Sequence, residues 1–247
     1  MTTGTTQRDL DGRSKRFKAV APTIERGKEY AVPEAVDLVK KTATAKFDET
    51  IEVHIRTSVD PQREGQGLRG VVSLPHGVGK AVRVVAFVQG EAANAARQAG
   101  ADYVADDELI AKIEKEGWSD FEVAVATPDM MGRIGRLGRV LGRKGLMPNP
   151  RTGTVVPPQD IGRVVQESKR GRMEFRMDKT AVIHAPIGKK SFSNDKLAEN
   201  FAALMDTVNK AKPAGIKGAF IRSVFMTSTM GPSVKLRLSD MTAAKAE

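Results

Sequence analysis

The sequence predicts an α/β protein of two domains, in which a middle domain is inserted into a first domain built from both ends of the chain. Strand patterns dominate the two ends, whereas apolar strands alternate with helices in the middle. Breaker clusters over residues 75–79 and 169–172 separate the two patterns. With 247 residues, the chain is long enough for two hydrophobic cores. We therefore expect a discontinuous α+β domain over residues 1–76 and 171–247, and an inserted domain over residues 77–170.

The first domain begins with a polar arm, which we expect to be flexible over residues 1–12 and at most partly helical up to Lys18. Residues 32–43 have apolar side chains at helical spacing, which predicts a helix. Residues 49–59 alternate apolar and polar side chains, which predicts a strand, and a second strand follows over residues 70–74. The strand over residues 49–59 has Ile51, Val53, Ile55 and Thr57 on one face, and Glu52, His54 and Arg56 on the other.

The inserted domain shows a β-α-β-α-β alternation. We expect strands over residues 81–88, 101–104 and 121–126, and helices over residues 91–98 and 106–116. The first of these strands is apolar almost throughout, which suits a strand that is buried on both faces. Such an alternation predicts a small parallel sheet covered by helices.

The last part of the chain returns to strands, which with the early strands predict an antiparallel sheet with helices. A helix near residues 159–168 precedes the second breaker cluster, and residues 194–211 form an amphipathic pattern. The core stripe of that amphipathic helix comprises Leu197, Phe201, Leu204, Met205 and Val208. The expected strands cover residues 173–176, 181–185, 218–227 and 234–238.

The charge of the chain favours an acidic partner. A net charge of +10 and a pI near 9.8 point to nucleic acid first and to an anionic membrane surface second. No apolar run reaches the roughly 18 residues needed to span a bilayer, the N-terminus has no signal-peptide pattern, and the protein is expected to be cytoplasmic. Because there is no cysteine, a disulfide, a thiol nucleophile and a thiolate metal site are all excluded. The low aromatic content of 5% favours recognition of folded RNA over stacking of single-stranded bases.

Residues 132–150, GRIGRLGRVLGRKGLMPNP, form the most unusual segment. They include five glycines, four arginines and one lysine, and no acidic residue. Glycine lets a backbone approach a ligand closely, and unpaired cations attract phosphate. We therefore expect a loop that contacts a polyanion, although a solvated basic turn at a helix end is the simpler alternative. The candidate cations are Arg133, Arg136, Arg139, Arg143 and Lys144.

The sequence offers no enzyme site. A phosphate-binding loop ending at Lys80 would need glycine in place of Leu74 and a hydroxyl residue in place of Ala81. The histidines, His54, His76 and His184, are not spaced as metal ligands, although His54 could contact RNA from the polar face of its strand. We expect no catalytic set, no metal, no cofactor and no small-molecule substrate.

Two further segments allow two interpretations each. Residues 227–233, TSTMGPS, fit a tight turn, but their hydroxyls could also bind phosphate or ribose while Met230 packs on a sugar or base. Residues 46–50, KFDET, fit the start of a strand, but they could also set a cation and an aromatic ring beside RNA. The residue pattern alone does not choose between these interpretations.

Several motifs together resemble the bacterial ribosomal protein uL1 family. They are ATAKFDETIEVHI at 43–55, VSLPHGVGK at 72–80, LGRKGLMPNPRTGTV at 141–155, FRMDKTAVIHAPIG at 175–188 and TSTMGPSV at 227–234. The resemblance extends from about residue 13 to residue 238, and its motifs are specific.

The resemblance implies a protein of the mobile L1 stalk of the large ribosomal subunit, with 23S rRNA and other ribosome components as partners. It implies that the discontinuous domain holds the main rRNA-binding surface, that the inserted domain is a Rossmann-like α/β unit, and that the protein assists release of tRNA from the exit site. Family members also commonly repress translation by binding the mRNA of their own operon. The rRNA-contacting motifs of the family match Lys46, Phe47, Thr50, Glu52, His54, Arg176, Asp178, Lys179, Ser228, Thr229, Met230 and Gly231.

Three positions depart from the usual pattern of the family. Arg143 stands where proline is common, which adds charge and removes a fixed φ. Met177 replaces a frequent asparagine, so that a polar RNA contact by this residue is not expected. Ala181 replaces a frequent glycine.

Overall fold

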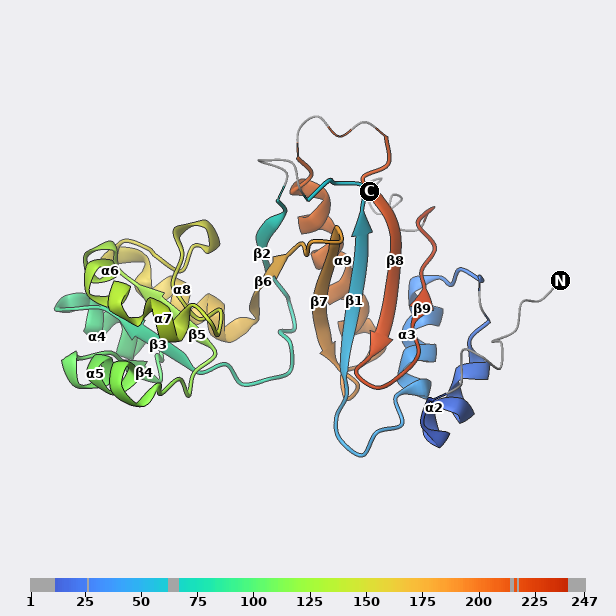
Figure 1. Ribbon diagram of the computed structural model, residues 1–247, viewed down its shortest axis with the longest axis horizontal. Helices are drawn as coiled ribbons and strands as arrows, with labels where there is room; N and C mark the ends of the chain where they lie inside the picture. Colours follow the sequence, from blue (N-terminus) through green and yellow to red (C-terminus); the bar gives the residue numbers. More distant parts are fainter. Residues whose placement is uncertain (1–11, 26, 62–66, 214–215, 217, 240–247) are drawn as a thin grey trace. The chain divides into compact units, whose positions relative to one another are not determined.

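The computed structural model describes residues 12–25, 27–61, 67–213, 216 and 218–239. The chain divides into two compact units (Figure 1). Unit 1 comprises residues 1–79 and 175–247, and unit 2 comprises residues 80–174. The expected two-domain α/β fold, with an antiparallel sheet in one unit and a small parallel sheet in the other, is confirmed.

Unit 1 is built on a four-stranded antiparallel sheet with the order β7-β1-β8-β9. The central strand β1 (Thr50–Thr57) pairs on one side with β7 (Val182–Lys189) and on the other with β8 (Ile221–Ser228), and β9 (Val234–Lys235) forms the edge. The apolar face predicted for β1 is buried, and its polar face points the other way.

Helices α3 (Val32–Thr42) and α9 (Asn194–Lys210) pack against one face of this sheet. In Figure 1 both helices lie behind the strands, and no helix of unit 1 lies in front of them. The five residues of the predicted α9 stripe are all buried, because they fill the layer between helix and sheet. The outer face carries the polar side chains of β1, with the partly exposed Phe225, Pro186 and Val182 of the neighbouring strands beside them.

The remaining elements of unit 1 are short. The first elements of the described residues are α2 (Lys15–Val20) and the 3₁₀ turn η1 (Ala21–Thr23), so the part of the expected arm around Lys18 is helical. Residues 1–11 of that arm lie outside the described residues. Strand β2 (Arg69–Ser73) pairs with β6 (Arg172–Arg176) in a separate two-stranded sheet.

Unit 2 is a three-layer α/β unit around a parallel sheet with the order β4-β3-β5. All four residues of the central strand β3 (Val84–Phe87) are buried, as predicted for a strand covered on both faces. The strands β4 (Tyr103–Val104) and β5 (Val123–Ala126) are shorter than their apolar runs, because ladder pairing covers only part of each run. One outer layer consists of α4 (Glu91–Gln98) and α8 (Ile161–Arg170). The other outer layer consists of α5 (Asp107–Glu116) and α6 (Pro128–Ile134).

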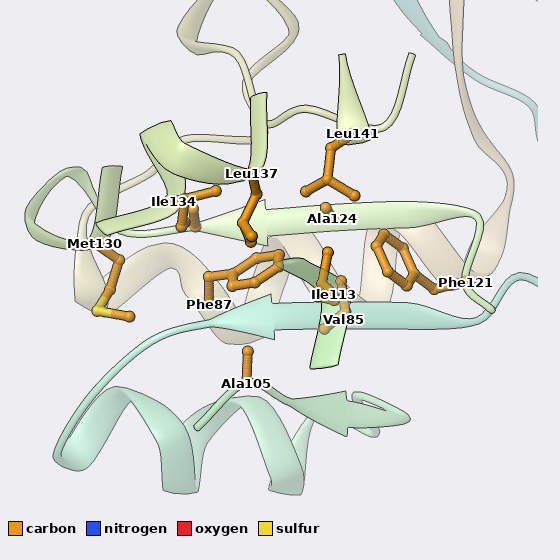
Figure 2. Packing of buried hydrophobic residues seen from close by; sticks show 11 residues of the cluster. Val85, Phe87, Ala105, Ile113, Phe121, Ala124, Met130, Ile134, Leu137 and Leu141 are labelled. Atoms are coloured by element: carbon orange, nitrogen blue, oxygen red, sulfur yellow. The ribbon is translucent and has the colours of Figure 1, made fainter. Parts of the chain in front are cut away.

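The glycine-rich basic segment is not the open loop that the sequence predicted. It continues α6 through the 3₁₀ turn η2 (Gly135–Leu137) into α7 (Gly138–Leu141), and only residues beyond 141 leave the helical path. Figure 2 shows Leu137 and Leu141 pointing into the core of unit 2, toward the strands. Their burial, with that of Ile134, outweighs the low helix propensity of the intervening glycines. Two 3₁₀ turns, η3 (Pro150–Thr152) and η4 (Pro158–Asp160), then lead to α8.

Candidate nucleic-acid interface

Two large apolar side chains are exposed in the described part of the chain, and both lie at one end of the unit 1 sheet. Phe47 is 54% exposed and precedes β1, and Met230 is 51% exposed and follows β8. Because Ile51 pairs with Ser228 in the antiparallel ladder, the two side chains belong to neighbouring loops. We call these loops, residues 44–49 and 228–232, the sheet corner. An exposed apolar pair rimmed by polar residues is typical of an interaction surface.

Glu49 links the two loops by hydrogen bonds from its side chain. Its side chain is fully buried, and its carboxylate accepts the N–H of Ala45 at 2.7 Å and the N–H of Met230 at 2.9 Å. Burial acts to raise the pKa of the Glu49 carboxyl, but the N–H groups of Ala45 and Met230, followed by the Ser228 hydroxyl and the charge of Arg16, outweigh burial and lower that pKa below its ordinary value. Sequence reasoning missed Glu49, because a charged residue one position before a strand usually faces water.

Two hydroxyl groups of the 227–233 segment, those of Thr227 and Thr229, form hydrogen bonds inside the protein, and the Ser228 side chain is buried. The Thr229 hydroxyl accepts the N–H of Thr50 at 3.0 Å, and the Thr227 hydroxyl donates to the carbonyl of Gly231 at 3.3 Å. The N–H of Gly231 closes the turn on the carbonyl of Ser228 at 3.1 Å, and a β-carbon on Gly231 would clash with the Ser228 hydroxyl. These contacts favour the tight-turn interpretation for the hydroxyls, whereas the exposure of Met230 favours a contact with a partner.

Cations surround the sheet corner. Lys46 is exposed and has no hydrogen bond or ion pair to another described residue. Lys189 donates to the Thr50 hydroxyl at 2.8 Å, and Lys190 donates to the carbonyl of Ala43. The charges of these lysines are not neutralised by carboxylates in those contacts, and they are therefore available to phosphate.

The outer face of the sheet holds a second group of predicted residues. His54 lies opposite His184 on β7, and the side chain of His184 lies 3.5 Å from Asp178. The hydroxyl of Thr180, followed by the N–H of Val182, lowers the pKa of Asp178 to about 2. Arg176 and Lys179 are exposed near this end of the sheet, and Glu52 lies between the two groups on β1. Thr50, Glu52 and His54 thus follow the outer face of β1. The predicted Ser228 is instead buried opposite Ile51, and Arg176 ends β6 of the two-stranded sheet.

The three departures from the family pattern have different structural settings. Met177 is buried and accepts the Thr57 hydroxyl at 3.5 Å, so its side chain belongs to the core. Ala181 has φ +64°, and it is the one non-glycine residue with positive φ among the described residues. Arg143 is exposed between two turn glycines of unit 2.

The basic segment of unit 2 presents its arginines to solvent. Arg136, Arg139 and Arg143 are exposed, and none of them makes an ion pair with another residue that the structure describes. Arg133 pairs with Asp107 at 3.0 Å, and Lys144 donates to the Ser119 hydroxyl. The arginines point outward because the leucines of the same turns point into the core.

Within the described ranges, no three His, Asp or Glu side chains are placed to hold a metal ion, and no helix is long and apolar enough to cross a bilayer. The lysine of the rejected phosphate-loop motif, Lys80, pairs with Glu122 at 2.9 Å.

These observations define a two-domain α/β protein with a discontinuous first unit, an inserted parallel unit and unpaired surface cations. The chain belongs to the ribosomal protein L1 family: residues 39–232 match the Ribosomal protein L1p/L10e family. It is 54% identical over 220 residues to the "Large ribosomal subunit protein uL1" of two strains of Chloroflexus aurantiacus. The matched region covers 89% of this chain and 93% of each relative. It is 53% identical over 224 residues to the protein of the same name from Chloroflexus aggregans, with 91% and 94% of the two chains covered.

Proposed function

We propose that the protein is a constituent of the large ribosomal subunit in the cytoplasm, where unit 1 binds 23S rRNA at the L1 stalk. The observation that best supports this role is the pair of exposed apolar side chains, Phe47 and Met230, on a sheet corner ringed by lysines. Membership in a ribosomal protein family and the names of the relatives support the same proposal. No catalytic step is part of it.

The chemistry of the sheet corner suits RNA. Phe47 and Met230 would pack on a ribose or base, and Lys46 would pair with phosphate. Burying one such apolar side chain contributes about 1.5–3 kcal/mol, and phosphate contacts add affinity that depends on salt. Glu52, His54 and Asp178 would accept or donate hydrogen bonds along the outer face of β1, with Arg176 and Lys179 against the backbone.

The test is a pair of substitutions at Met230. Met230→Asp would place a negative charge against RNA, and we expect at least a hundredfold loss of affinity for a stalk rRNA fragment in a filter or gel assay. Met230→Leu keeps the apolar contact and should lose less than fivefold. Unchanged affinity of Met230→Asp, with a folded protein by circular dichroism, would show that the assigned surface is wrong.

The arginines of unit 2 are proposed as an auxiliary RNA contact. Three unpaired guanidinium groups on adjacent turns are suited to consecutive phosphates. A triple variant that replaces Arg136, Arg139 and Arg143 by Gln should bind RNA more weakly and with a shallower dependence of affinity on salt. The control replaces three exposed lysines of α5 and α3 by Gln: Lys112, Lys115 and Lys41. This control should keep the RNA affinity and the salt dependence of the unmodified protein. An unchanged salt slope in the arginine variant would exclude this contact.

Two finer roles rest on the family resemblance. The same surfaces would serve in the movement and release of tRNA at the exit site, and in binding a stalk-like element of the operon mRNA. Either RNA offers the phosphates and unpaired bases that the sheet corner and the unit 2 arginines would bind. Crosslinking of the protein to RNA in cell extract separates the rRNA, tRNA and mRNA partners, and the absence of tRNA or operon mRNA from the crosslinked pool would reject the corresponding role.

A further inference from the structure

Glu49 is the least expected side chain at the sheet corner. A fully buried carboxylate loses its hydration, which costs several kcal/mol unless hydrogen bonds replace it. No Lys or Arg of the described residues lies in ion-pair contact with Glu49. The backbone N–H groups of Ala45 and Met230 donate to its two oxygens, and the Ser228 hydroxyl and the charge of Arg16, which lies beyond ion-pair distance, also favour the ionised form. Core packing alone does not account for a charge in this place, since an apolar residue would avoid the desolvation.

The two N–H groups belong to two loops that are far apart in the sequence. Ala45 lies two residues before Phe47, and the N–H of Met230 is 181 positions away from Glu49. Each oxygen of the carboxylate serves one loop: Oε1 accepts from Ala45 and Oε2 from Met230. One side chain therefore fixes the backbone beneath both exposed apolar groups.

We propose that Glu49 is a positioning residue that makes Phe47 and Met230 a single preformed contact for RNA. This inference rests on the proposed RNA-binding function of the sheet corner. A loop that is ordered before binding does not lose conformational entropy when the partner arrives, so the carboxylate raises affinity without touching RNA. The ionised group is needed because only a carboxylate presents two acceptor oxygens to two N–H donors.

The conservative variants separate this role from packing. Glu49→Gln has nearly the same shape, but its amide NH₂ would face one of the two N–H groups and leave that donor unpaired. Glu49→Asp keeps the charge, but it is one methylene shorter and cannot reach both loops. Both variants should bind a stalk rRNA fragment about tenfold to thirtyfold more weakly than the unmodified protein.

A destabilised control variant is available in the same unit. Leu204→Ala removes a fully buried side chain of α9 on the helix side of the sheet, away from both loops. Measured well below the melting temperature of every variant, Leu204→Ala should lose stability and keep its RNA affinity within threefold. If Leu204→Ala loses as much affinity as Glu49→Gln, the effect of Glu49 is general destabilisation and the proposal is wrong.

A double-mutant cycle tests the linkage directly. In the unmodified protein, the losses of affinity caused by Phe47→Ala and Met230→Ala should be non-additive by at least threefold, and in the Glu49→Gln background they should become additive. Additive losses in both backgrounds would contradict the proposal. If even Met230→Asp binds RNA normally, the proposed function of the corner fails, and that result is distinct from a failure at Glu49 alone.

Hydrogen exchange on the unmodified protein provides a measurement that needs no variant. The amides of Ala45 and Met230 should exchange at least tenfold more slowly than those of Lys46 and Thr44 in the exposed loop, and at rates similar to each other. Fast exchange at both amides would overturn the proposal even if the Glu49 variants failed to fold.

Discussion

His54 and His184 share a hydrogen bond across the outer face of the unit 1 sheet. Their Nδ1 atoms lie 2.7 Å apart, and their rings meet edge to face with centroids 4.9 Å apart. Such a bond needs one protonated and one unprotonated nitrogen, so full protonation of both rings would break it. Burial, followed by the proximity of His184, lowers the pKa of His54.

This pair predicts a loss of stability in mild acid. Because the pKa of His54 is lower in the folded than in the unfolded protein, the unfolded state binds more protons as the pH falls below about 6.5. The free energy of unfolding of unit 1 should therefore decrease between pH 7.5 and pH 5.5, as measured by urea denaturation. The glutamine in His54→Gln can still form a hydrogen bond but does not titrate. The free energy of unfolding of this variant should therefore decrease less between pH 7.5 and pH 5.5. An equal decrease in both proteins would contradict this assignment.

Ala181 predicts a stabilising substitution. An L-residue at φ +64° costs about 1 kcal/mol or more relative to glycine, and the carbonyl of Ala181 is fixed there by the N–H of Thr57 at 2.9 Å. Ala181→Gly should raise the free energy of unfolding of unit 1 by about 0.5–1 kcal/mol, because relief of strain exceeds the added entropy of the unfolded chain. Ala181→Val should lower it. Thermal melts that rank the three proteins in another order would show that this backbone position is not strained.

Glu122 predicts an acid-sensitive contact in unit 2. Its carboxylate accepts hydrogen bonds from the Arg83 side chain at 3.0 and 3.2 Å and from the Arg83 backbone N–H at 2.9 Å. The bonds from Arg83, together with the hydrogen bond from Lys80, lower the pKa of Glu122 to about 2. The stabilisation that the ionised Glu122 contributes to unit 2 should be complete above about pH 4.5 and should be lost as the pH falls toward 2. Glu122→Gln should destabilise unit 2 by about 1–2 kcal/mol at pH 7 and by much less at pH 2.

Trp118 makes that measurement specific. It is the one tryptophan of the chain and packs near Tyr103 and Phe121 in unit 2, so its fluorescence reports the unfolding of unit 2. Asp129→Asn removes an acidic residue for which no ion pair is found among the described residues of unit 2, and it serves as the control. Equal effects of Glu122→Gln and Asp129→Asn would argue against the contact.

The separate core of each unit predicts that unit 1 folds without unit 2. Replacing residues 80–170 by a short glycine-serine linker keeps both β2 and β6 and the whole four-stranded sheet. The fragment should melt cooperatively and bind the stalk rRNA fragment, and Met230→Asp within it should abolish that binding. A folded fragment with no RNA affinity would place the main RNA-binding surface elsewhere.

Local patterns explain most of what could be predicted. The alternation of residues 49–59 gave the correct faces of β1, and the stripe of α9 gave the correct core, because burial on one face has a fixed period. The basic segment was wrongly expected as a loop up to residue 141. Its five glycines favour a loop, but the burial of Ile134, Leu137 and Leu141 stabilises the helical path. Glu49 gave no signal, because its partners lie in loops that the sheet brings together.

The sequence by itself determined the two-unit α/β fold, the basic character and the identity of the family, because periodicity, charge and motifs are local properties of the chain. Only the tertiary structure decided that Phe47 and Met230 lie on neighbouring loops, that His54 faces His184, and that Ala181 adopts a left-handed conformation. The physical reason is that strand register and antiparallel pairing join positions more than a hundred residues apart. No local pattern encodes such a distance.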